Sequence, residues 1–209
     1  MSGEPEHLHL TYNDIHKLIE KSAKEIAKSF QPDVFIAIGK EIGFFPARVL
    51  RTFLKNPATK RNIPIHAIGL SLYESLPGTT AEQIGNQVIR TQWLGPESNN
   101  ILLGKRVLIV DEVDDSRKTL HYAVSELQKD VEKAIAALPE GEREAAKTQF
   151  GVFVVHNKLK EKLASLPSNV PYFAGAEVAD LWLDYPWEAS DIDEHDRLAA
   201  EEKAAGKHK

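Results

Sequence analysis

The sequence of 209 residues contains no cysteine, so it can form no disulfide bridge, thiolate metal site or cysteine nucleophile. It has no apolar run of membrane-spanning length, and we expect no membrane partner. Its first ten residues, MSGEPEHLHL, lack a cationic region leading into an apolar core, so we expect no signal peptide. A net charge of −5 does not favour a nucleic-acid partner. Together these absences predict a cytoplasmic enzyme or binding protein.

What is present is an alternation of apolar runs and amphipathic stretches. The 42% hydrophobic and 27% charged content is ordinary for a globular protein, and the length fits one domain or one domain with a small hood. We expect strands at 34–38, 63–72, 88–93, 107–110, 151–155 and 172–178. We expect helices at about 13–30, 44–53, 116–138, 142–148, 160–166 and 190–199. This alternation predicts a mostly parallel, doubly wound α/β sheet with right-handed crossovers.

Two segments have weaker patterns. The first ten residues predict an irregular start, and Thr11 or Asn13 is expected to cap the first helix. Residues 74–87 are polar and rich in turn formers, which predicts a long loop of the kind that often forms a lid.

Polar residues follow several predicted strands at the point where each strand ends. They are Gly39-Lys40, Ser71 to Tyr73, Asp111 to Thr119 and His156 to Lys158. Because ligands of open parallel sheets bind outside the carboxyl ends of the strands, we expect these groups to converge on one site.

The stretch RVLIVDEVDDSRKT, residues 106–119, concentrates this chemistry. Hydroxyls and backbone N–H groups after Asp115 can cup a terminal phosphate, with the dipole of the following helix behind it. The carboxylates of Asp111 and Glu112 can accept hydrogen bonds from vicinal hydroxyls or hold a divalent cation. The pattern indicates a ribose 5-phosphate site. The alternative, an acidic helix cap with solvated charges, is disfavoured because four acids after a buried strand suffer desolvation and mutual repulsion.

Within this stretch, VLIVDEVDDSRKT resembles the phosphoribosyl-pyrophosphate (PRPP) loop of type I phosphoribosyltransferases. The resemblance extends over nearly the whole chain. It is closest to the purine salvage group of fungal-type hypoxanthine-guanine and xanthine enzymes, which share DEVDD, RTQW, SLYE and YPW. It implies the type I phosphoribosyltransferase fold in a single domain, 1–209. The core would span about 11–157, and 158–197 with the N-terminal segment would form a small hood subdomain.

The resemblance implies an enzyme that transfers the 5-phosphoribosyl group from PRPP to a purine base. The base would be hypoxanthine, guanine and/or xanthine, the cofactor Mg²⁺, and the products IMP, GMP or XMP plus pyrophosphate. Relatives form dimers or tetramers, so the resemblance also implies a homodimer or homotetramer.

The resemblance also assigns roles on the PRPP side. Asp111 and Glu112 match the acids that hold the ribose hydroxyls and help place Mg²⁺, and Asp115 matches the catalytic acid or base near purine N7. The set matched to the 5-phosphate cup is Asp114, Asp115, Ser116, Arg117, Lys118 and Thr119. The set matched to the pyrophosphate side is Gly39, Lys40, Asp191 and Arg197. Ser71 and Tyr73 lie where the mobile flap begins in relatives.

On the base side, Trp182 matches the aromatic residue that stacks on the purine, and Leu183 matches the residue whose backbone meets its edge. Either His156 or Lys158 would read the 6-oxygen. Glu188 is a further candidate, near C2 of the base.

This sequence departs from the family pattern at several positions. Glu112 replaces the usual second aspartate, and Arg117 stands where many relatives have glycine. Asp114 stands where many relatives have an apolar residue; its side chain either points away from the ligand or towards Arg117.

Alternative interpretations stay open at this point. Trp182 fits core packing, His156 a satisfied histidine at a strand end, and Asp191 with Arg197 an exposed pair on a helix. A non-catalytic, nucleotide-sensing regulator on the same fold is the main rival function. A P-loop phosphotransferase is disfavoured because GxxxxGK[ST] does not occur.

Overall fold

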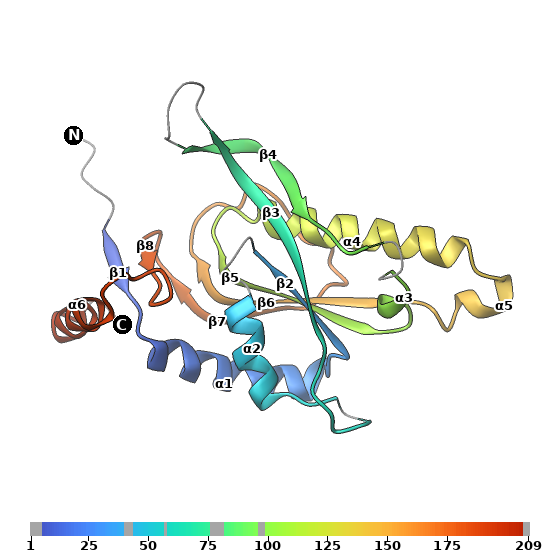
Figure 1. Cartoon of the computed structure of the whole chain (residues 1–209), viewed down its shortest axis with the longest axis horizontal. Helices are drawn as coiled ribbons and strands as arrows, with labels where there is room; N and C mark the ends of the chain where they lie inside the picture. The colour runs from blue at the N-terminus through green and yellow to red at the C-terminus, as the bar shows by residue number, and fades with distance from the viewer. Residues whose placement is uncertain (1–5, 40–43, 57, 76–81, 96–98, 207–209) are drawn as a thin grey trace.

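The computed structural model describes residues 6–39, 44–56, 58–75, 82–95 and 99–206, with the backbone alone at 72–75, 82–87 and 99–100. A six-stranded sheet in the order β4-β3-β2-β5-β6-β7 forms its centre (Figure 1). Its strands are β2 Val34–Ile38, β3 Ile65–Ser75, β4 Glu82–Gln92, β5 Arg106–Asp114, β6 Gln149–Lys158 and β7 Tyr172–Val178. All neighbours pair in parallel except β3 and β4. The predicted mostly parallel α/β sheet is therefore confirmed.

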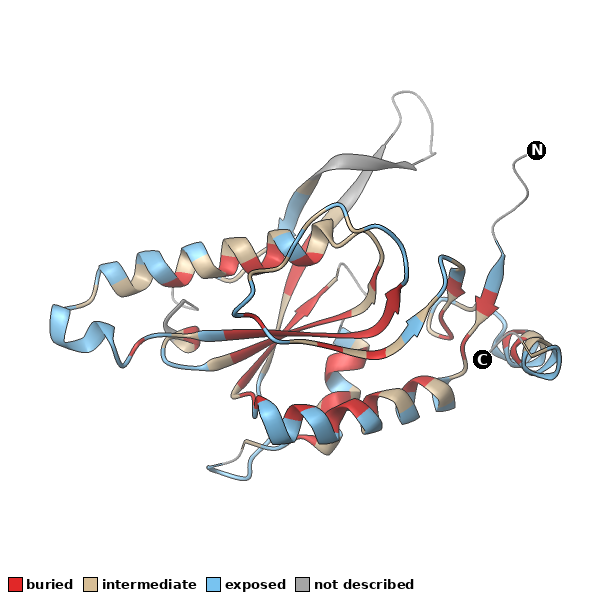
Figure 2. Ribbon diagram, turned by 180° about the vertical axis from the view of Figure 1, so that it is seen from behind, coloured by how far each residue is buried: buried red, intermediate tan, exposed pale blue. Residues whose placement is uncertain are grey.

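Helices cover both faces of the sheet (Figures 1 and 2). Helices α1 Tyr12–Ser29 and α2 Phe44–Phe53 pack on one face, and α4 Lys118–Ala136 packs on the other. Strand β5 alternates between the two cores: Leu108 and Val110 join the first, while Val107 and Ile109 join the second. A strand buried on both faces needs a continuous apolar run, and this explains VLIV.

Helix α1 shows how the sequence sets the ends of an element. The backbone N–H of Asp14 donates to the Thr11 hydroxyl at 3.2 Å, and the Asp14 carboxylate accepts from the Thr11 N–H at 3.1 Å. This capping box makes Thr11, and not Asn13, the N-cap, a position worth about 1 kcal/mol. Ile15, Ile19 and Ile26 then face the core at helical spacing.

A second, two-stranded parallel sheet lies at one end of the molecule, beside α6 (Figure 1). Strand β1 His7–His9 pairs with β8 Trp182–Asp184, and α6 Ile192–Ala204 packs against β1. The prediction of an irregular start was wrong at β1. Three residues are too few to show the apolar alternation of a strand. They form a strand only by pairing with residues 175 positions away (His7↔Trp182).

The described residues of 74–87 belong to strands and not to the expected long loop. Strand β3 runs to Ser75 and β4 begins at Glu82, so the described part of this segment is an antiparallel hairpin. The backbone of the hairpin extends beyond the body of the molecule (Figure 1). A strand outside the core need not carry the apolar alternation that marks a half-buried strand in a sequence.

The expected helix at 160–166 is also absent: the described residues between β6 and β7 contain no helix. Strands β5 and β6 extend past their predicted ends into the polar residues Asp111–Asp114 and His156–Lys158. Two short helices complete the described elements, α3 Asn99–Leu102 and α5 Glu140–Arg143. Among the described residues no helix is long and apolar enough to cross a membrane.

Candidate active site

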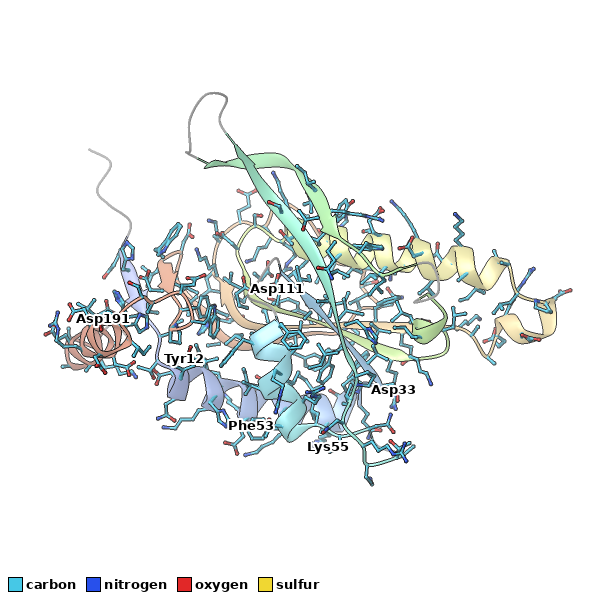
Figure 3. The ribbon with its side chains drawn as sticks, viewed as in Figure 1. Tyr12, Asp33, Phe53, Lys55, Asp111 and Asp191 are labelled. Atoms are coloured by element: carbon cyan, nitrogen blue, oxygen red, sulfur yellow. The ribbon has the colours of Figure 1, made fainter. Side chains whose placement is uncertain are left out.

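The carboxyl ends of the parallel strands bring the predicted polar groups to one edge of the sheet. Residues pair in register from β2 to β5 at Ala37↔Val110 and from β5 to β6 at Asp114↔Asn157. Gly39, Asp111–Asp115 and His156–Lys158 are therefore neighbours in space, and Asp111 lies near the centre of this edge (Figure 3). The convergence expected from the sequence is confirmed for these groups.

Gly39 makes the turn at the end of β2. Its φ of 153° lies in a region that favours glycine, and its N–H donates to the carbonyl of Ile68 at 3.0 Å. Lys40, expected on the pyrophosphate side, lies outside the described residues.

Asp111 and Glu112 form an acidic pair in which Asp111 is buried and Glu112 is partly buried. The Glu112 N–H donates to Asp111 Oδ1 at 3.1 Å, and Glu112 Oε2 is buried without a hydrogen-bond partner among the described residues. Burial and the charge of Glu112 raise the pKa of Asp111 well above its ordinary value, and burial raises the pKa of Glu112. Such a pair favours an incoming cation or hydroxyl donor. The described residues contain no group of three metal-ligating side chains, so a metal held here would need further oxygen ligands from a substrate.

Asp115 has cationic partners instead. Its two carboxylate oxygens lie 2.8 Å from Lys160 Nζ and 3.3 Å from Lys158 Nζ. Burial raises the pKa of Asp115, but the bonds and charges of the two lysines outweigh this and lower it overall. Asp115 is therefore ionised at neutral pH.

The segment after Asp115 forms the start of helix α4. Arg117 is its N-cap, with a left-handed φ of 68°, and the Lys118 N–H lies 3.5 Å from Ser116 Oγ. This long helix has no acidic residue in its first turn, so its N-terminal N–H groups and the hydroxyls of Ser116 and Thr119 suit an anion.

Asp114 and Arg117, both in the predicted phosphate cup, bind one another. The Arg117 guanidinium donates to Asp114 Oδ2 from Nε at 2.9 Å and from Nη2 at 2.7 Å, and the Asp114 side chain is fully buried. Of the two directions that the sequence left open for Asp114, the structure has the one towards Arg117.

His156 and Lys158 have different surroundings. His156 is buried, its Nδ1 lies 2.9 Å from the Tyr185 hydroxyl, and burial lowers its pKa to about 4, so the ring is neutral. The Tyr185 hydroxyl in turn donates to the backbone carbonyl of Glu112 at 3.1 Å. Only Lys158 faces Asp115.

The residues expected near the purine base also differ in their surroundings. Trp182 is 53% exposed, which leaves a ring face open for stacking, whereas Leu183 behind it is buried. The ring of Trp187 stacks on that of Tyr185, with 4.6 Å between the ring centroids, so Trp187 is a packing residue. The Glu188 N–H donates to the Tyr185 carbonyl at 3.1 Å; burial and the charge of Glu112 raise the pKa of Glu188.

The structure does not bring Asp191 and Arg197 to the strand ends. Asp191 caps α6 by accepting from the Glu194 N–H at 3.0 Å, and Arg197 pairs with Glu194 and Glu201 on the same helix. Figure 3 shows Asp191 far from Asp111. Asp191 and Arg197 do not pair with each other, and their expected place on the pyrophosphate side stays a prediction. Ser71 lies on β3 opposite Ile89, and the side chain of Tyr73 lies outside the described part of the chain.

Four residues of the site were missed by sequence reasoning. They are Lys160, Lys162, Tyr172 and Tyr185. The signal that could have found two of them is the alternation Lys158-Leu159-Lys160-Glu161-Lys162 directly after a buried strand, opposite four acids.

Comparison with known proteins gives close relatives over nearly the full length. The chain is 52% identical to a hypoxanthine-guanine phosphoribosyltransferase of Schizosaccharomyces pombe, with 94% of this chain and 96% of the relative covered. It is 50% identical to xanthine phosphoribosyltransferase 1 of Saccharomyces cerevisiae, with 94% and 97% covered. No family model matches the chain.

Solved structures are similar to the chain over most of its length. A hypothetical protein from Neisseria gonorrhoeae with bound ppGpp is 38% identical, with a TM-score of 0.74 and coverage of 95% of this chain and 98% of the other. A purine phosphoribosyltransferase from Pyrococcus horikoshii has a TM-score of 0.60 at 21% identity, covers 90% and 97% of the two chains, and supports the fold alone.

Proposed function

The chain belongs to the hypoxanthine-guanine and xanthine phosphoribosyltransferases, and we propose that it transfers the 5-phosphoribosyl group of PRPP to a 6-oxopurine. The base is hypoxanthine, guanine and/or xanthine, and the products are IMP, GMP or XMP plus pyrophosphate. The observation that carries the proposal is the end of strand β5. It places two adjacent acids, an ionised aspartate and a helix N-terminus in succession at one sheet edge.

The phosphate and ribose of PRPP have partners at this edge. The N–H groups at the start of α4 and the hydroxyls of Ser116 and Thr119 hold the 5-phosphate. Asp111 and Glu112 accept hydrogen bonds from the ribose hydroxyls and, with substrate oxygens, hold Mg²⁺. The unpartnered Oε2 of Glu112 supports this fit. When bound, Mg²⁺ neutralises negative charge that develops on the pyrophosphate leaving group.

The base lies between Trp182 and Asp115 in this proposal. The exposed face of Trp182 stacks on the purine, and the backbone of Leu183 meets its edge. Lys158 donates to the 6-oxygen, and the ionised Asp115 accepts the proton from N7. General catalysis of this kind is worth about 10²–10⁴-fold.

Positive charge grows at the anomeric carbon as pyrophosphate leaves. We place the carboxylates of Asp111, Glu112 and Asp115 beside that carbon, where they would favour this charge. Gly39 and Lys40 remain the proposed contacts on the pyrophosphate side.

We retain three further expectations as proposals. The small sheet of β1 and β8 together with α6 supports a hood subdomain, drawn at 158–197 with the N-terminal segment, over a core at about 11–157. The homodimeric or homotetrameric state and the cytoplasmic location stay predictions.

A turnover assay tests the proposed function. The purified chain, PRPP and Mg²⁺ are incubated with hypoxanthine, guanine or xanthine in turn, and pyrophosphate release and nucleotide formation are followed. We expect turnover with at least one base, and kcat/KM then ranks the three. No pyrophosphate release with any base would overturn the proposal.

The nucleotide-sensing alternative has one observation in its favour, the ppGpp bound to the Neisseria gonorrhoeae relative. A non-catalytic regulator would bind nucleotides without releasing pyrophosphate in that assay, so the same measurement separates the two functions.

A further inference from the structure

The loop at 159–171, between β6 and β7, is the bracing loop; it contacts the start of the phosphate-binding segment from one side. The Lys162 ammonium donates to three backbone carbonyls at once. They are those of Asp114 at 2.7 Å, Asp115 at 2.8 Å and Lys158 at 2.9 Å. A compact ammonium with three donors suits such a site, and it ties both neighbouring strand ends to the loop.

The contacts continue along the same segment. The Leu163 N–H donates to the carbonyl of Ser116 at 3.0 Å, and the Ser165 carbonyl lies 2.7 Å from His121 Nδ1 on α4. The bracing loop thus bonds the segment on both sides of the proposed phosphate-binding residues.

Arg117 has a conformation that needs compensation. Its φ of 68° lies in the left-handed region, where a residue with a side chain loses roughly 1–2 kcal/mol. Its guanidinium makes two hydrogen bonds to the buried Asp114 carboxylate and lies 4.8 Å above the ring of Tyr172. These contacts offset the backbone cost and engage the guanidinium with Asp114 and Tyr172.

The Asp114 carboxylate connects Arg117 to β7 and to the bracing loop. Its Oδ2 also accepts from the Tyr172 hydroxyl at 2.9 Å, and its Oδ1 lies 3.6 Å from Lys162 Nζ. A buried carboxylate bound to two cations is compensated from within the chain, and its charge would repel a phosphate. Tyr172 and Lys162 both touch this carboxylate, which links the bracing loop and β7 to Arg117.

We propose that Arg117, Asp114, Tyr172 and Lys162 are positioning residues that fix the backbone of 115–119, and that the Arg117 guanidinium is not a ligand of the 5-phosphate. This inference rests on the proposed function. The segment carries both the catalytic Asp115 and the phosphate-binding groups, so a displacement of about 1 Å can cost up to about 100-fold in rate.

The first test uses Tyr172→Phe and Lys162→Met, because neither side chain is a candidate phosphate ligand. The matched controls are Tyr12→Phe, for which the structure shows only ring contacts, and Lys24→Met, whose side chain is 77% exposed. Two measurements are made on each: kcat and KM for PRPP, and backbone hydrogen exchange of 115–119. We expect both test variants to lose about tenfold in kcat/KM for PRPP and to exchange faster at 115–119. The controls match the wild-type protein.

The second test replaces Arg117 itself. Glycine adopts a φ of 68° without strain, so Arg117→Gly is expected to retain more activity than Arg117→Ala. Arg117→Lys is expected to give no rescue, since an ammonium cannot form the two-pronged bond to Asp114. Adding Tyr172→Phe to Arg117→Gly is expected to cost nothing further, because both changes break the same network.

The inference is overturned if Tyr172→Phe and Lys162→Met match their controls while Arg117→Gly and Arg117→Lys raise KM for PRPP, since Arg117 would then bind the phosphate directly. Failure of the proposed function is visible separately, as a wild-type protein without turnover. Hydrogen exchange then decides the network: faster exchange at 115–119 in the two test variants supports it, and unchanged exchange overturns it.

Discussion

The acids at the end of strand β5 fall into two pairs with opposite surroundings. Asp111 is buried, Glu112 beside it is partly buried, and the described residues supply no ion pair to either. Asp114 and Asp115, by contrast, are bound by cations from the chain itself: Arg117, Lys158, Lys160 and Lys162. The difference teaches that the described part of the chain offers no cation to the first pair, which suits a proton or a ligand, while cations of the chain itself hold the second pair ionised.

The largest effect is expected at the compensated pair. Asp115→Asn removes the acceptor for the N7 proton and should lower kcat by about 10²–10⁴-fold, with little change in the unfolding temperature. Steady-state kinetics with the preferred base check this, with the exposed Asp196→Asn on α6 as the matched control. A variant that keeps more than about a tenth of wild-type kcat would remove Asp115 from the proton transfer.

An intermediate effect is expected at the uncompensated pair. Asp111→Asn should weaken binding of PRPP with Mg²⁺ by about 10–100-fold, because a ligand oxygen is lost. The same change should raise the unfolding temperature of the free protein by a few degrees, because it relieves repulsion with Glu112. Calorimetry and thermal unfolding measure the two changes. If Asp111→Asn lowers the unfolding temperature, the contrast between the pairs is wrong.

The smallest effect concerns pH. Lys160 lowers the pKa of Asp115, so Lys160→Met should raise that pKa. The ionised aspartate is the active form, and its pKa marks the acid limb of the pH profile, so the limb should move to higher pH. A profile of kcat/KM checks the direction, with the exposed Lys147→Met as a control. A limb that stays in place would mean that Lys160 does not control Asp115.

The sequence was sufficient to predict the central sheet and its helices, because apolar runs and helix caps are patterns of neighbouring residues. Strands β2 and β7 have the bounds predicted from their apolar runs, and Thr11 is one of the two predicted caps of α1. Strand β1 and the hairpin were missed for a different reason. A three-residue strand and a strand projecting from the body both depend on pairing with distant residues, which leaves little trace in the local pattern.

Some residues of the site could also be predicted from the sequence, and others could not. The acids after VLIV were found because buried strands that end in carboxylates are unusual, and their convergence follows from parallel topology. Lys160 and Lys162 resembled a solvated surface, since an exposed lysine and one that binds three carbonyls have the same sequence pattern. Asp191 illustrates the opposite ambiguity: an aspartate that caps its own helix and one that binds a ligand have the same sequence pattern.

The most direct test of the division at strand β5 is a Mg²⁺ titration of PRPP binding by calorimetry, in the wild-type protein, Asp111→Asn and Asp115→Asn. If the chain leaves Asp111 and Glu112 for an external cation, Asp111→Asn loses most of the Mg²⁺ dependence of PRPP binding and Asp115→Asn keeps it. Equal loss of Mg²⁺ dependence in both variants, or full dependence in Asp111→Asn, would contradict the division.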